Sequence, residues 1–263
     1  MSEAPIQQWD KKPGPFHASS VEAATVTYYY GLDISGYPGD SQMSVFWTNT
    51  PFWYTGFYLA PAPHHPDSSW MTKRTYLKNL GWGFLVIYVG RQEGDGGLLT
   101  YAQGQTDALN ASNLATQAGF PAGTTIFLDV EAGGGVLSSQ LTSYIQGWVN
   151  KLDSSATPFW AGVYCNFYKI ADLIKNAVGT DRCTFWCVNV NCTPSPGCNL
   201  PSPAPNPANC GVSYAANWQF ALSPKPAGIN CTGYTSGQCK QTYGGYSLNV
   251  DLDTATSQNP SNG

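Results

Sequence analysis

The stretch "TTIFLDVEAGGG", residues 124–135, joins a strand-like apolar run to two carboxylates and three glycines. Charged residues make up only 11% of the 263-residue chain, so two acids one residue apart stand out. Side chains alternate between the two faces of a strand, and residues two apart point the same way. Asp129 and Glu131 are therefore expected to project together from the end of a buried strand. Glycines 133–135 are expected to keep the following loop low or flexible.

Apolar runs of similar length recur along the chain and predict eight strands. These runs span residues 29–34, 54–59, 84–89, 125–130, 159–165, 184–190, 217–221 and 248–252. Helical periodicity follows in residues 107–120, 138–152 and 168–179, the second with Ser138 as its candidate N-cap. Strands that alternate with helices imply parallel strands with crossovers, so the chain is expected to form an α/β fold, a single closed (β/α)8 barrel over residues 28–263. Residues 1–27 are expected to be an N-terminal arm.

Two stretches of the sequence bear on how regular this alternation is. An open doubly wound sheet would need a glycine-rich nucleotide loop, but residues 31–39, "GLDISGYPG", lack the GxGxxG spacing and place Pro38 where a helix would begin. The barrel is therefore favoured. Residues 191–211, "NCTPSPGCNLPSPAPNPANCG", contain too much proline for a helix. A Cys/Pro-rich loop is expected to replace the helix between strands six and seven.

All eight cysteines lie in the last 100 or so residues, and no CxxC pair occurs among them. This spacing disfavours a zinc site and favours disulfides formed in an oxidising compartment, with their connectivity left open. The N-terminal residues "MSEAPIQQWDKKPGP" have no apolar signal core. An extracellular or periplasmic protein is expected, exported either with a removed signal or by another route.

The charge balance limits the possible partners. The net charge is −4, and no cluster of Lys and Arg occurs in the sequence. This excludes a nucleic-acid partner and gives no attraction to an anionic membrane. Nine Trp and 16 Tyr exceed the needs of a core and are typical of grooves that stack on sugar rings. The protein is expected to act as a monomer on a polysaccharide.

Other acids occur at the predicted strand ends. Asp33 ends the first strand, and Asp251 and Asp253 lie on the last, which neighbours the first in a closed barrel. Asp33 and Asp251 are therefore expected to meet Asp129 and Glu131 at the carboxyl end, where barrels hold their active sites. Crowded carboxylates raise the proton affinity of at least one, as a general acid requires. Capping and solvated acids remain the plain alternative, and Asp253 is expected to be a surface or capping residue.

Several short motifs follow one another in the order of the predicted strands. These are "GLDIS" at 31–35, "FLDVE" at 127–131, "GVYCN" at 162–166, "NWQF" at 217–220 and "NVDLD" at 249–253. The series resembles the glycoside hydrolase family 25 lysozymes. With "GYPGD", "TGFYLAP" and "LVIYVGRQ" it resembles more closely the DUF1906 family, the glycoside-hydrolase-like relatives of those lysozymes. The chitinase motif DxxDxDxE is not matched, because Thr124 and Phe127 stand at its first two acids.

The resemblance implies roles for the four acids. Glu131 matches the general acid that protonates the departing glycosidic oxygen. Asp129 matches the second carboxylate, which attacks the anomeric carbon or orients a substrate acetamido group. Asp33 and Asp251 match the acids that flank this pair.

The same resemblance implies Tyr164 and Trp218 as residues near the substrate. Arg91, at the end of the third predicted strand, is expected either to bind a sugar or to satisfy a carboxylate of the cluster. Tyr58, in the second predicted strand, is a further candidate for substrate binding. His64 and His65 are expected to be an exposed loop pair.

The sequence thus predicts a secreted, lysozyme-like glycoside hydrolase that cleaves a β-linked, N-acetylated polysaccharide. Peptidoglycan is the leading candidate substrate, and no metal or organic cofactor is expected. The alternatives are a non-catalytic carbohydrate-binding protein on a hydrolase-like barrel and an effector toxin aimed at the cell wall.

Overall fold

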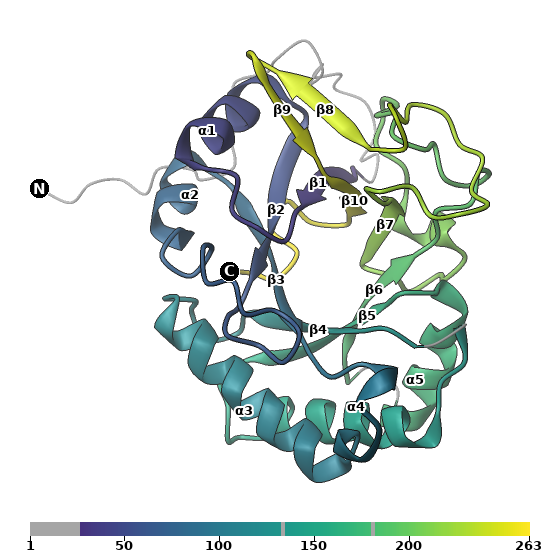
Figure 1. The fold of residues 1–263 in the computed structure, drawn as a ribbon. Coiled ribbons are helices and arrows are strands. Elements are labelled where there is room, and N and C mark those ends of the chain that lie inside the picture. The colour runs from purple at the N-terminus through teal and green to yellow at the C-terminus, as the bar shows by residue number, and fades with distance from the viewer. Residues whose placement is uncertain (1–26, 133–134, 180–181) are drawn as a thin grey trace, which may run out of the picture.

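Eight strands close into a barrel in the order β1, β10, β7, β6, β5, β4, β3, β2 (Figure 1). The computed structural model describes residues 27–132, 135–179 and 182–263. Apart from residue 27, the predicted N-terminal arm lies outside the described residues, as do glycines 133 and 134. The barrel strands are β1 Tyr29–Asp33, β2 Phe52–Tyr58, β3 Gly83–Val89, β4 Thr125–Val130, β5 Trp160–Cys165, β6 Thr184–Val188, β7 Asn217–Ala221 and β10 Asp251–Ala255. The predicted α/β barrel is confirmed.

The last barrel strand runs against the others. Strands β1 to β7 are mutually parallel, whereas β10 pairs antiparallel with both β1 and β7. The expectation of eight parallel strands is therefore wrong for the eighth. The chain reaches β10 through a hairpin, β8 Lys240–Tyr243 and β9 Tyr246–Asn249. The predicted strand 248–252 straddles β9 and β10, because its apolar/polar alternation continues through Val250, the residue between them.

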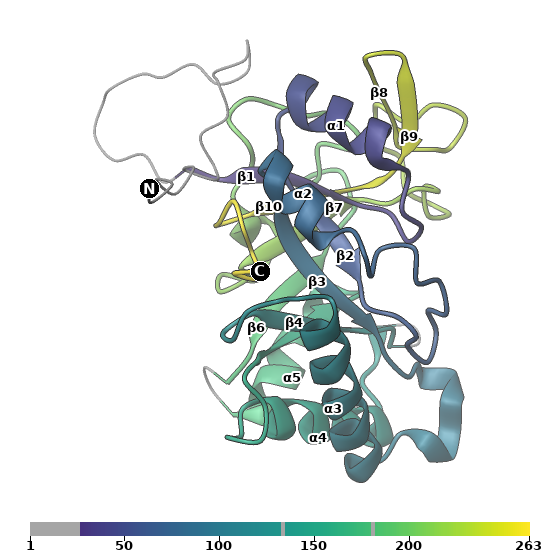
Figure 2. The same ribbon diagram turned by 90° about the vertical axis from the view of Figure 1, so that its left-hand side faces the viewer.

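Five α-helices occur in the described residues: α1 Asp40–Asn49, α2 Arg74–Leu80, α3 Tyr101–Gln117, α4 Ser139–Leu152 and α5 Ala171–Val178. Three of them were predicted, and Ser138 caps α4 by accepting a hydrogen bond from the Leu141 N–H at 3.1 Å. Helix α1 escaped prediction because it buries only Met43 and Phe46. The helices cover the barrel on the side of β2 to β5, as both ribbon views show (Figures 1 and 2). None of the described helices is both long and apolar enough to cross a membrane.

The side of β6, β7 and β10 is covered differently. Between β6 and β7 the chain forms only a short 3-10 turn, η4 Pro207–Cys210, so the predicted Cys/Pro-rich loop replaces a helix there. Disulfides Cys192–Cys231 and Cys198–Cys239 join this loop to the segment that follows β7. The other four cysteines, at positions 165, 183, 187 and 210, are thiols. The expectation of disulfides thus holds for half of the cysteines.

Candidate active site

Strand pairing brings the four predicted acids to one end of the barrel. Asp33, the last residue of β1, lies opposite Asp251, the first residue of the antiparallel β10. Asp129, the last residue but one of β4, pairs with Tyr164 of β5. Asp33 is 3% exposed, Asp129 and Asp251 are partly exposed, and Glu131, just beyond β4, is exposed. This end of the barrel, formed by the carboxyl ends of the parallel strands, is called the mouth below.

A glycine on the neighbouring strand leaves the space that Asp33 occupies. A Cβ atom at Gly56 of β2 would lie 2.6 Å from the Cβ of Asp33, closer than real atoms approach. Only glycine therefore fits beside this carboxyl.

Asp33 receives hydrogen bonds on both carboxyl oxygens. The Tyr58 hydroxyl donates to Oδ1 at 2.7 Å, and Nε2 of Gln219 donates to Oδ2 at 2.8 Å. Burial raises the pKa of Asp33, while the neighbouring Asp253 and the hydrogen bonds from Tyr58 and Gln219 work against that rise. Asp33 is thus the buried acid best supplied with donors for a negative charge.

Asp251 shares the Gln219 amide with Asp33. Its Oδ2 accepts from Nε2 of Gln219 at 3.2 Å, and its Oδ1 accepts from the Ser223 N–H at 2.6 Å. Burial and the nearby Asp33 charge raise the pKa of Asp251 well above its usual range, against the effect of the Ser223 hydrogen bond. The two acids are therefore tied through one amide group.

Asp129 differs from these acids. Its Oδ1 is buried and has no hydrogen-bond partner among the described residues. Burial, the charge of Glu131 and the charge of Asp33 raise the pKa of Asp129 to about 8. At neutral pH this carboxyl therefore holds a proton, although its outer part still reaches solvent. A protonated carboxyl that is partly exposed in this way can act as a general acid.

The backbone around Glu131 is fixed by Gln92, which follows β3. Its Oε1 accepts a hydrogen bond from the Glu131 N–H at 2.5 Å, and its Nε2 donates to the carbonyls of Gly90 and Asp129 at 3.1 and 3.2 Å. The pairing of β3 with β4 is thus continued by a side chain beyond the end of the strands. We call Gln92 with these three contacts the glutamine clamp.

The predicted binding residues Tyr58 and Tyr164 join the acids, but Trp218 does not. Tyr58 contacts Asp33, and the Tyr164 hydroxyl donates to Oε1 of Gln219 at 2.8 Å. Trp218 is fully buried, and its Nε1 donates to the Asn189 carbonyl at 2.9 Å. Because Gln219 faces the mouth, the adjacent Trp218 faces the outer shell of the barrel. A substrate at the mouth would not contact Trp218.

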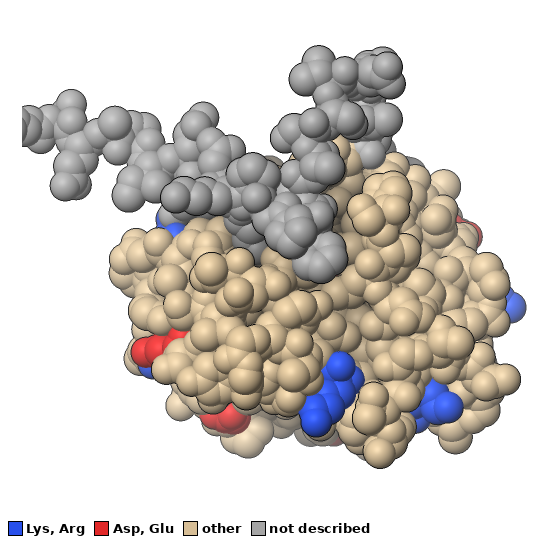
Figure 3. Space-filling model, turned by 90° about the horizontal axis from the view of Figure 1, so that it is seen from above, with Lys and Arg blue, Asp and Glu red and all other residues tan. Residues whose placement is uncertain are grey.

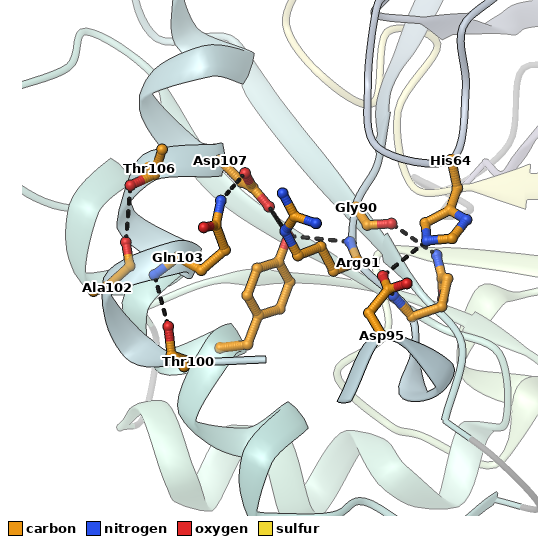
Figure 4. A network of polar contacts seen from close by, with 11 residues as sticks. His64, Gly90, Arg91, Asp95, Thr100, Ala102, Gln103, Thr106 and Asp107 are labelled. Atoms are coloured by element: carbon orange, nitrogen blue, oxygen red, sulfur yellow. Dashed lines mark hydrogen bonds and ion pairs between the residues drawn. The ribbon is translucent and has the colours of Figure 1, made fainter. Parts of the chain in front are cut away.

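Arg91 points toward Asp107 of α3 (Figure 4). Its Nε lies 3.2 Å from Oδ2 of Asp107 on α3, and its backbone N–H donates to the Tyr144 hydroxyl. The Tyr144 hydroxyl in turn donates to the same Asp107 oxygen at 2.8 Å. Of the two roles considered, Arg91 satisfies a carboxylate, but that carboxylate is Asp107 and not a member of the mouth.

Asp253 was expected at the surface and is instead fully buried below the mouth. Its Oδ1 accepts a hydrogen bond from Nε1 of Trp186 at 2.9 Å, and its Oδ2 is buried with no hydrogen-bond partner among the described residues. Burial and the Asp33 charge raise the pKa of Asp253 well above its usual range. The surroundings of Asp253 therefore favour its protonated form.

The predicted exposed histidine pair is correct for only one member. His64 is exposed, and its Nε2 lies 2.8 Å from Oδ2 of Asp95 (Figure 4). His65 is 7% exposed, and its ring lies 4.9 Å from the Tyr58 ring. Burial lowers the pKa of His65. Among the described residues, no group of three or more His, Cys, Asp and Glu is placed to hold a metal ion.

The residues that sequence reasoning missed are Gln92, Gln219 and Asp253. All three stand inside the quoted motifs "LVIYVGRQ", "NWQF" and "NVDLD". Alternation along the strands was the available signal. Asp253 lies two residues after Asp251 and so shares its face of β10, and Gln219 is the polar residue between the apolar Trp218 and Phe220 of β7.

The model of the Rv2525c-like, glycoside hydrolase-like domain matches residues 46–255. No curated protein matches the chain. Among solved structures, the Mycobacterium tuberculosis Tat-secreted protein Rv2525c is 16% identical, with 91% of this chain and 100% of that chain covered and a TM-score of 0.57. The Clostridium perfringens spore cortex lytic enzyme SleM is 13% identical, with coverage of 90% and 69% and a TM-score of 0.57. A family 25 glycosyl hydrolase from Bacillus anthracis is 11% identical, with coverage of 91% and 95% and a TM-score of 0.51. At these identities the three structures show a shared fold.

Proposed function

The chain belongs to the Rv2525c-like family of glycoside hydrolase-like domains, and we propose from this membership and from its mouth that it hydrolyses a glycosidic bond. The proposed substrate is a β-linked, N-acetylated polysaccharide, and peptidoglycan is the leading candidate. The similarity to a spore cortex lytic enzyme and to a family 25 glycosyl hydrolase supports this choice.

The observation that carries the proposal is the difference between Asp129 and its neighbours. The pKa of Asp129 is raised to about 8 by burial and by the charges of Glu131 and Asp33. Acid catalysis of glycoside cleavage needs one carboxyl that still holds a proton and a second that is ionised. We propose Asp129 and Glu131 as this pair, because Asp129 holds a proton and the exposed Glu131 lies two residues further along the chain at the mouth.

The two carboxyls act as a pair in this proposal. The resemblance implies Glu131 as the proton donor, whereas burial in the substrate-free protein favours the proton on Asp129. Because the two groups interact, a proton shared between them belongs to the pair. One member protonates the departing glycosidic oxygen, and the other stabilises or attacks the anomeric carbon from its ionised form.

Substitution of each acid tests the proposal. Wild type, Glu131→Gln and Asp129→Asn are incubated with purified peptidoglycan and chitin, and released ends are analysed by mass spectrometry. Wild type is expected to release new reducing ends, and each variant to lose at least about a hundredfold in rate. Asp153→Asn, which alters an acid paired with Arg182 away from the mouth, is the matched control and should keep full rate. Equal rates in wild type and both mouth variants would overturn the assignment.

A carbohydrate-binding protein without catalysis remains the second reading, and the mouth gives it less support. Sugar binding by stacking needs exposed ring faces. Tyr58 and Tyr164 are only 8% and 7% exposed, and they contribute hydroxyls to the acid network. Wild type that binds the glycan but releases no ends would favour this second reading.

We also propose that the protein works outside the cytoplasm. Two disulfides join the Cys-rich loop to the segment after β7, and oxidising compartments favour such bonds. The similar protein Rv2525c is described as Tat-secreted. Fractionation of the source cells, with detection of the protein by antibody, tests this location, and recovery with cytoplasmic markers would contradict it.

A further inference from the structure

One glutamine connects more of the mouth than any predicted site residue does. Gln219 lies on β7, is 2% exposed, and directs its side-chain amide to three strands at once. Nε2 donates to Asp33 of β1 at 2.8 Å and to Asp251 of β10 at 3.2 Å. Oε1 accepts from the Tyr164 hydroxyl of β5 at 2.8 Å. All the hydrogen-bonding capacity of the Nε2 group is spent on carboxylates.

We propose that Gln219 is a positioning residue that holds Asp33 as the charged acid of the mouth and thereby keeps the proton of the catalytic pair on Asp129. This inference rests on the proposed function for the role of the pair. It does not require that the substrate be known, because the property that it concerns exists in the substrate-free protein.

The amide has only one useful orientation. A glutamine turned over would point its oxygen at Asp33 and Asp251, and an oxygen cannot donate to a carboxylate. The two carboxylates therefore select the observed orientation, in which Nε2 faces Asp33 and Asp251. The Tyr164 hydroxyl donates to Oε1 in this orientation and helps to hold the amide there, so Tyr164 acts on the acids through Gln219.

The donors are distributed unequally over the mouth. Asp33 accepts from Tyr58 and Gln219, and each of these hydrogen bonds favours its ionised form. Oδ1 of Asp129 is buried and unpartnered among the described residues. Protonation of Asp129 is therefore more favourable in free energy than protonation of Asp33.

The charge of Asp33 then acts on Asp129. Burial comes first among the causes that raise the pKa of Asp129, and the charges of Glu131 and Asp33 follow. The other ionisable groups that face Asp129 are Asp251 and the hydroxyls of Tyr58 and Tyr164, and burial raises the pKa of all three well above their usual range. Loss of the Gln219 donor would let Asp33 take a proton and would lower the proton affinity of Asp129.

The test is a titration of the full chain labelled with 13C at the aspartate carboxyls, followed by NMR. The signal of Asp129 is identified by its loss in Asp129→Asn. In wild type it is expected to titrate at about 8. In Gln219→Met, which keeps the length of the side chain and removes its donors, the proton affinity of Asp129 is expected to fall by about tenfold.

Gln241→Met is the matched control. Gln241 is 7% exposed on β8 and donates to the Cys198 carbonyl at 3.3 Å, so its loss also removes a buried amide, but outside the mouth. This variant should leave the Asp129 titration unchanged. Tyr164→Phe is the second test variant, needed if Gln219→Met does not fold, and it should shift Asp129 in the same direction by a smaller factor.

An Asp129 titration that is the same in wild type, Gln219→Met and Tyr164→Phe would overturn the inference. This outcome is separate from the fate of the proposed function. If the wild type hydrolyses glycan while the titration does not move, only the role of Gln219 fails. If the titration moves and no glycan is cut, the proposed function fails and the role of Gln219 in the acid network stands.

Discussion

At the scale of single residues, the spacing of the acids was predictable and their environments were not. Alternation along a strand places Asp129 beside Glu131, and closure of the barrel places Asp33 beside Asp251. The same rule applied to β7 puts Gln219 and Trp218 on opposite faces, but sequence alone does not say which face is inside. Both residues are buried, one against the mouth acids and one against the outer shell, so hydropathy could not separate them.

The buried proton of Asp129 has a cost for the stability of the fold. An aspartate in the unfolded chain ionises at about pH 4, whereas Asp129 in the folded protein ionises at about 8. Between these pH values the folded state binds more protons, so stability falls as pH rises. Asp129→Asn, which cannot ionise, is expected to escape this loss and to be more stable than wild type by roughly 2–5 kcal/mol at pH 8.

This first prediction is checked by chemical denaturation at pH 4 and at pH 8. The stability gain of the variant should be small at pH 4, where both proteins are neutral at this position, and should grow toward pH 8. Asp153→Asn serves again as the control. A gain that is the same at both pH values would mean that Asp129 is not the titrating group.

At the scale of elements, the sequence failed to predict those features that depend on the rest of the fold, such as the direction of a strand. The seven parallel strands follow from apolar runs and helical gaps. The antiparallel β10 does not, because its direction depends on the β8–β9 hairpin, which returns the chain to the mouth. Helix α2 was missed for a similar reason: it is short, and only Arg74 and Leu77 are buried in it.

The glutamine clamp predicts a local change at the end of β4. Gln92→Leu removes the acceptor of the Glu131 N–H, and exchange of that backbone amide with solvent is expected to quicken by about tenfold. Gln92→Glu keeps an acceptor oxygen at the same place and should retain most of the protection. Hydrogen exchange followed by NMR gives the measurement. Equal protection in all three proteins would show that the clamp does not hold Glu131.

The disulfides predict a global effect from a loop. Cys198 and Cys239 are 41 residues apart, and closing a loop of this length stabilises a fold by about 2–4 kcal/mol through the unfolded chain. The double variant Cys198→Ser, Cys239→Ser is expected to lose that amount in denaturant unfolding. Cys183→Ser, which alters a thiol outside any disulfide, is the control and should change little. An unchanged midpoint in the double variant would contradict the prediction.

At the scale of the whole molecule, the fold and the end of the barrel that bears the acids were predictable, because periodicity and strand-end chemistry survive in the sequence. The charge properties could also be predicted from the sequence, which has a net charge of −4 and no basic cluster. The face seen from above shows only scattered charged side chains among its described atoms (Figure 3). Contact with a polymer is therefore expected to depend on hydrogen bonds and shape rather than on charge.

Salt dependence checks this expectation. Cosedimentation of the protein with purified peptidoglycan should change by less than about twofold between roughly 20 and 200 mM salt. A basic protein bound to an anionic wall would lose most of its binding over that range. A steep decline would show that a local positive surface governs the contact.

The reversed direction of β10 has a practical meaning for laboratory evolution. Asp251 follows the β8–β9 hairpin after only Val250, and the hairpin base pairs Lys240 with Asn249. The parallel strands carry their loops after the acids, but here a hairpin comes immediately before one. Libraries randomised in this hairpin would change the approach to Asp251 without rewriting the scaffold that carries Asp129 and Glu131, which makes the hairpin a natural graft point for altered glycan preference.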